Sequence, residues 1–156
     1  MNGVNYCGAY LEHLQAEHHR LNCALIGIRH EIAELNHTSR PLEALATLRE
    51  KLENLLLELR GHFAEEEEGG CLEEAEARCP SLGPQAKHLM RENSQLVRAL
   101  ERVLATAKDQ SANSHALRKQ FEPFATDLRE HECAENRLLQ TALGGDAADY
   151  DVEGNE

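Results

Sequence analysis

The chain has 156 residues, 41% of them hydrophobic and 28% charged, which is the size and balance of one soluble globular domain with a single core. Its 28 acidic residues outnumber 16 basic ones and give a net charge of −12, which argues against a nucleic acid or a membrane surface as partner and favours cations. No apolar run reaches the roughly 20 residues of a membrane span and the first residues do not resemble a secretory signal, so we expect a cytoplasmic protein.

Aromatic residues make up only 4% of the chain and Trp is absent, whereas Leu, Ala, Glu and Arg are abundant, so an all-α fold is favoured over a β-sandwich or barrel. Apolar residues recur at helical spacing in four segments, which span residues 11–35, 45–59, 89–103 and 117–142. Turn residues separate these segments at 36–41, 69–84 and 109–114. This order predicts an antiparallel up-down-up-down four-helix bundle over residues 1–143, followed by a disordered acidic tail over residues 144–156.

Polar side chains interrupt the apolar stripes of the first and second predicted helices. At about 100° per residue, His18 falls within roughly 40° of the centre of the first stripe, whereas its neighbour His19 points elsewhere. On the second helix the leucine stripe continues into His62 and Glu66, which are four residues apart and therefore lie one above the other. Both helices are thus expected to direct imidazoles into the interior.

The fourth predicted helix places a histidine and a carboxylate in the middle of its apolar stripe. His131 and Glu135 stand between Leu128 and Leu138, while Cys133 is turned away from the interior. An unpaired buried carboxylate is strongly disfavoured, so it takes up a proton, meets a cation or coordinates a metal. A single buried histidine is more often a hydrogen-bonded core residue than a ligand. Here two H-x-x-x-E pairs, His62/Glu66 and His131/Glu135, continue leucine stripes and a further histidine converges with them, which favours iron or manganese.

The third predicted helix departs from this pattern. In an antiparallel hairpin, residues at the same level are equidistant from the turn, which pairs His18 with His62 and pairs His131 with Asn93. The first and third helices also share the sequences L-x-x-E-H-x-x-L and L-x-x-E-N-x-x-L, so the chain looks like a duplicated hairpin in which one histidine has been replaced.

Asn93 has three possible roles in such a site. Its amide oxygen could ligate a metal weakly, its amide could hydrogen-bond a metal-bound water, or it could do neither. His88 lies five residues earlier, about 7 Å along the helix axis, and we expect it to be exposed to solvent rather than to replace the missing ligand.

Three segments resemble the metal-binding segments of the hemerythrin-like (HHE cation-binding) family over about residues 11–142. They are EHHRL at 17–21, HFAEEEEGG at 62–70 and HECAENRLLQ at 131–140. The resemblance implies a four-helix bundle with a non-haem di-iron centre, in which His18, His62 and His131 would be terminal ligands and Glu66 and Glu135 would bridge the metals. It also implies that Asn93 stands where the family carries a histidine.

Three functions are compatible with these residues. The first is a di-iron protein that binds or senses dioxygen or takes part in iron handling. The second is a di-iron enzyme that acts on peroxide or another small oxidant, so that enzymatic activity stays an open question. The third is a metal-poor helical interaction module that has lost one ligand at Asn93. The protein partners of such a chain are not indicated by its sequence.

Overall fold

The computed structural model describes residues 2–69 and 71–143. Within these residues the chain is helical apart from short connections, and it contains no strand, so the expected all-α class is confirmed. The acidic tail expected at 144–156 lies outside the described residues. None of the helices between residues 2 and 143 combines the length and the apolar character that crossing a membrane requires.

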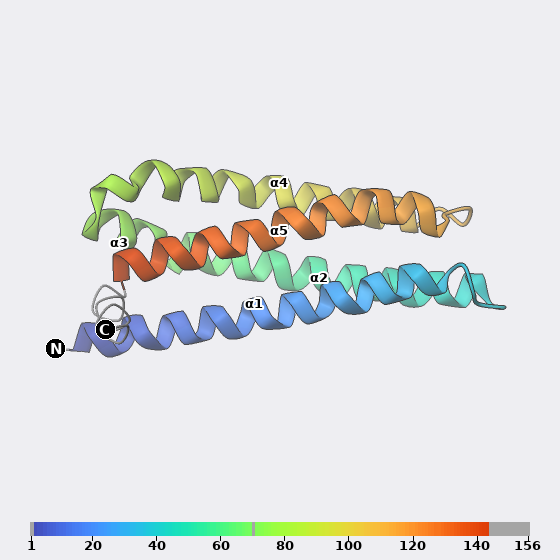
Figure 1. Cartoon of the computed structure of the whole chain (residues 1–156), viewed down its shortest axis with the longest axis horizontal. Coiled ribbons are helices and arrows are strands. Elements are labelled where there is room, and N and C mark those ends of the chain that lie inside the picture. The colour runs from blue at the N-terminus through green and yellow to red at the C-terminus, as the bar shows by residue number, and fades with distance from the viewer. Residues whose placement is uncertain (1, 70, 144–156) are drawn as a thin grey trace, which may run out of the picture.

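Four long helices and two short ones make up the described chain. They are α1 (Asn2–Glu34), α2 (Pro41–Gly69), α3 (Cys71–Arg78), the 3-10 turn η1 (Pro80–Leu82), α4 (Gly83–Ala107) and α5 (Ser114–Leu143). The four long helices correspond to the four predicted amphipathic segments, and the leucine stripe of each is buried. Helices α1 and α4 each pack against both α2 and α5, which closes a ring of four around a common core. In Figure 1 the connections 35–40 and 108–113 lie at one end of this bundle and α3 lies at the other.

The connection expected over residues 69–84 is more ordered than the sequence indicated, because it contains α3 and η1. Cys71, Leu72 and Ala75 are buried on one side of α3, so a helix lets this segment cover the end of the bundle. The Sγ atom of Cys71 lies 2.9 Å from the hydroxyl oxygen of Tyr10 on α1. Burial raises the pKa of this thiol to about 11, so Cys71 stays protonated at neutral pH and ties α3 to α1.

The buried apolar residues form two clusters along the bundle. The larger cluster occupies the half that ends at the connections 35–40 and 108–113, and the smaller lies at the α3 end. On α1 the smaller cluster includes Leu14 and the larger begins at Leu21, whereas on α5 the larger ends at Leu128 and the smaller resumes at Leu138. The buried side chains between these limits are polar. A polar layer therefore separates two apolar layers inside the molecule.

Two leucines of α2 test whether this packing holds the bundle together. Leu55 is 1% exposed and Leu57 is 67% exposed. We expect Leu55→Ala to lower the free energy of unfolding by about 2–5 kcal/mol through lost burial and a cavity. Leu57→Ala is the matched control and should stay within about 0.5 kcal/mol of the wild type. Urea denaturation followed by circular dichroism measures both. Equal losses of unfolding free energy in the two variants would contradict the orientation of α2, in which Leu55 is buried and Leu57 is exposed.

Candidate metal centre

The polar layer brings together the five side chains that the sequence singled out. Helix α1 contributes His18, α2 contributes His62 and Glu66, and α5 contributes His131 and Glu135. All five are at most 5% exposed. They are buried because each continues the leucine stripe of its helix, so the packing that buries the leucines also buries the polar residues.

Glu135 lies at the centre of this layer, and different histidines face its two carboxylate oxygens. Its Oε1 is 3.3 Å from Nε2 of His18 and 3.6 Å from Nε2 of His62. Its Oε2 is 3.4 Å from Nε2 of His131. Glu66 reaches the layer from α2, with Oε1 2.8 Å from Nε2 of His62. Because Glu135 has nitrogen donors on both sides, its carboxylate is placed to serve two cations at once.

These close contacts are not hydrogen bonds. The Nε2 atoms of the three histidines and both carboxylate oxygens of Glu66 and Glu135 have no hydrogen-bond partner among the described residues. Leaving a buried polar group without a partner costs about 1–3 kcal/mol, and native proteins seldom leave one unsatisfied. Donor atoms that converge without bonding to one another are therefore suited to a ligand that accepts their lone pairs.

The donor atoms fall into two groups, each of which could hold a metal ion. One group is His18, His62 and Glu135, and the other is Glu66, His131 and Glu135; within each, the ligand atoms lie within 4.8 Å of one another. Imidazole nitrogen together with carboxylate oxygen suits first-row transition metals such as iron and manganese. The residues present thus fit two cations that share Glu135.

The pKa values in the layer reflect a need for positive charge. Burial disfavours the charged form of His62, but the carboxylates of Glu135 and Glu66 outweigh burial and raise its pKa to about 11. Burial, with Glu135 nearby, raises the pKa of Glu66 to about 8. Burial also disfavours the carboxylate of Glu135, yet its contacts with Glu66 and the histidines hold its pKa well below the usual value. Protons on the imidazoles balance the carboxylates, and bound cations would take over that role.

Two further carboxylates orient the histidines, and the sequence analysis assigned them no role. Nδ1 of His62 donates a hydrogen bond to Oε2 of Glu17 at 2.6 Å, and Nδ1 of His131 donates one to Oε2 of Glu92 at 2.9 Å. Each bond holds the imidazole so that Nε2 is left for a metal. The signal that could have found them lies in the related sequences of the first and third predicted helices. Glu17 precedes His18 just as Glu92 precedes Asn93, so the two glutamates occupy equivalent positions.

Aromatic packing also fixes the imidazole rings. The ring centroid of Phe63 lies 5.5 Å from that of His62 and 5.6 Å from that of His131. The rings of His18 and His62 meet edge to face at 5.3 Å. Because Phe63 is itself buried, these contacts restrict the rotation of three imidazoles and position their nitrogens before any metal binds.

The remaining candidates lie in three different environments. Asn93 is 2% exposed, and neither its amide oxygen nor its amide nitrogen has a hydrogen-bond partner in the described part of the chain. His88 is exposed, as expected, and its Nε2 lies 2.6 Å from Oε1 of Glu92, so it reaches the layer only through that carboxylate. Cys133 is exposed and takes no part. Glu132 is a buried carboxylate that the sequence analysis did not identify, and burial raises its pKa.

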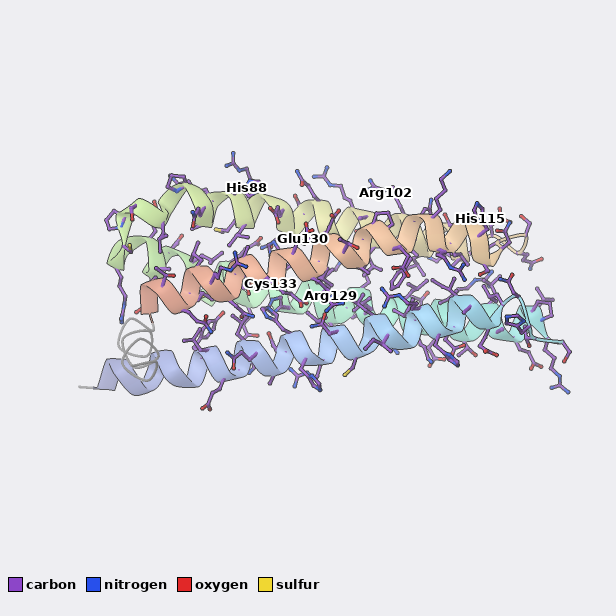
Figure 2. All side chains as sticks on the ribbon, viewed as in Figure 1. His88, Arg102, His115, Arg129, Glu130 and Cys133 are labelled. Atoms are coloured by element: carbon purple, nitrogen blue, oxygen red, sulfur yellow. The ribbon has the colours of Figure 1, made fainter. Side chains whose placement is uncertain are left out.

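A groove between α4 and α5 gives access to one side of the layer. Its volume is about 960 Å³, and its lining includes His131 and Glu92 together with Leu89, Leu96 and Ala134. Polar side chains also line it, among them His88 and Arg102 of α4 and Glu130 of α5 (Figure 2). Small molecules can therefore approach the His131 side of the layer from solvent.

The role of Glu92 in orienting His131 can be tested by substitution. We expect Glu92→Gln to weaken iron or manganese binding by about 10–100-fold, because a neutral amide accepts the Nδ1 hydrogen bond less strongly than a carboxylate. Equilibrium dialysis with metal analysis measures the change. Glu53→Gln, at an exposed position of α2, is the control and should leave the affinity unchanged. An affinity unchanged in Glu92→Gln would contradict the orienting role.

Comparison with known proteins agrees with this arrangement. The chain matches the family model of the hemerythrin HHE cation-binding domain over residues 9–143. No curated protein and no solved structure matches it. The matched span includes α2, α4 and α5, the part of α1 from residue 9 onward, and every residue of the polar layer described above. The chain belongs to the hemerythrin HHE cation-binding family.

Proposed function

We propose that this chain is a non-haem di-iron protein that binds or senses dioxygen, or takes part in iron handling. His18 and His62 would hold one iron, His131 would hold the other, and Glu66 and Glu135 would serve both. The observation that carries the proposal is the position of Glu135, whose two oxygens face separate histidine nitrogens at 3.3–3.6 Å. Manganese is the alternative metal for the same donors.

The residues of the chain would each have a distinct task in such a centre. Bound iron supplies redox chemistry and open coordination positions for a small oxidant. Glu66 and Glu135 would neutralise the charge of two cations that lie close together. Glu17 and Glu92 would fix the rings of His62 and His131, and the apolar layers on both sides would exclude bulk water from the centre.

A peroxide-consuming enzyme is the second candidate, and the groove between α4 and α5 favours it. His131 is only 2% exposed, yet it lines the groove, so a molecule as small as hydrogen peroxide has a short path to its side of the layer. Turnover also requires that the product leaves, and an open groove allows this. Substrate identity depends on the groove lining and on the coordination positions that the protein leaves open.

Asn93 supports a third candidate, a metal-poor bundle that acts through protein contacts. An asparagine in the polar layer offers at most one weak neutral ligand, and the His131 group contains one imidazole where the other group contains two. We also propose that residues 1–143 form one domain whose long helices alternate in direction, because the connections 35–40 and 108–113 are short.

Iron loading tests the proposal directly. We expect the purified chain to bind two iron ions after anaerobic loading with Fe(II), with an absorption spectrum that changes when oxygen is admitted. A spectral change that vacuum reverses favours oxygen binding, whereas removal of hydrogen peroxide over many turnovers favours the enzyme. A folded chain that contains no iron, manganese or zinc after loading would rule out both metal-dependent functions.

The ligand deficiency at Asn93 gives a second test. We expect Asn93→His to raise the iron content and the free energy of unfolding of the loaded protein, because metal-binding energy adds to folding energy in such sites. Elemental analysis and thermal unfolding, each with and without iron, measure the two effects. An unchanged iron content would mean that position 93 does not serve the centre.

A further inference from the structure

A second group of metal-binding side chains lies on the surface, next to the buried layer. It consists of His13 and Glu17 on α1 and Glu65 on α2. The Nε2 atom of His13 lies 3.1 Å from Oε1 of Glu17 and 3.1 Å from Oε1 of Glu65. The donor atoms of all three side chains lie within 4.8 Å of one another, as they do in each buried group.

Glu17 connects this surface group to the buried layer. Its Oε1 faces His13, while its Oε2 accepts the hydrogen bond from Nδ1 of His62 at 2.6 Å. The side chain of Glu17 is 16% exposed, whereas those of His13 and Glu65 are 47% and 50% exposed. The group therefore extends from solvent to the residue that orients a proposed ligand of the buried centre.

The charges of the group favour a cation. Carboxylate oxygens of Glu17 and Glu65 lie within 4.8 Å of each other, so two acidic side chains of different helices converge. The imidazole of His13 adds a nitrogen donor, with Nε2 3.1 Å from an oxygen of each carboxylate. Two neighbouring exposed carboxylates repel each other and normally move apart into solvent. A divalent cation among the three donors would remove this repulsion.

We propose that His13, Glu17 and Glu65 form a third cation site, which holds a divalent transition-metal ion on the surface beside the buried centre. One nitrogen and two carboxylate oxygens from the protein leave further coordination positions to water, so the ion exchanges with solvent more readily than a buried one. Its role in supplying metal to the His62 side rests on the proposed di-iron function, whereas the binding itself does not.

An ion pair that only joins α1 to α2 is the competing explanation. A protonated His13 could bridge the two carboxylates, and exposed pairs of this kind contribute about 0–1 kcal/mol to stability. Such a pair binds no metal, so the number of bound ions separates the two explanations. The exposed positions of His13 and Glu65 allow substitution without disturbing the core.

The test is a titration with Mn²⁺, in which electron paramagnetic resonance counts the free ion, on the full chain and on His13→Ala and Glu65→Gln. We expect both variants to bind one fewer Mn²⁺ per chain than the wild type. The exposed residues His30 and Glu58 provide the controls His30→Ala and Glu58→Gln, which should bind as the wild type does. Equal counts in all five proteins would overturn the proposal.

The difference between wild type and variants reports the surface site however many ions the buried layer takes up. If the buried centre does not bind two ions, every protein should bind fewer Mn²⁺ ions than the two buried groups predict. If the surface site does not exist, the wild type and the variants His13→Ala and Glu65→Gln should bind the same number of ions. For the supply role, stopped-flow loading with Fe(II) should be several-fold slower in His13→Ala and Glu65→Gln, with the same final iron content in the buried centre. Equal loading rates would refute that role.

Discussion

The burial of Glu66 and Glu135 is the constraint on which the rest of the structure depends. Two carboxylates with almost no exposed surface lie between two apolar layers, where a charge without a counter-charge is strongly disfavoured. The fold places three imidazoles beside them. His18 comes from α1, and His62 and His131 come from the helices that carry Glu66 and Glu135. Without protons or cations to neutralise these carboxylates, the four helices could not pack around the layer.

The same constraint explains how the site is built around its donors. Glu17 and Glu92 occupy the Nδ1 atoms of His62 and His131, and Phe63 packs against both rings, so the free nitrogens point into the layer. The two carboxylates satisfy the Nδ1 atoms and leave the Nε2 atoms without a hydrogen-bond partner. The inward-facing donors lack hydrogen bonds to one another, which leaves their lone pairs available to a cation.

The layer is not symmetric, and this bears on its chemistry. The His18 and His62 side has two imidazoles and lies beside the surface group at His13, whereas the His131 side has one imidazole and borders the groove between α4 and α5. One side is thus richer in imidazoles and the other is more open to small molecules. The sequences L-x-x-E-H-x-x-L of α1 and L-x-x-E-N-x-x-L of α4 differ at His18 and Asn93, so the two hairpins contribute different side chains to the layer.

The sequence alone determined the helical class, the four amphipathic segments and the inward direction of His18, His62, Glu66, His131 and Glu135, because a helix fixes which residues share a face. It could not determine α3, whose few apolar residues become a buried face only when the bundle end is present to receive them. It also left Glu17, Glu92 and Glu132 unassigned, since they lie beside the stripes and gain their contacts across helices. The sharing of Glu135 between two groups of donors was decided by tertiary structure alone, because it depends on where three helices place their side chains relative to one another.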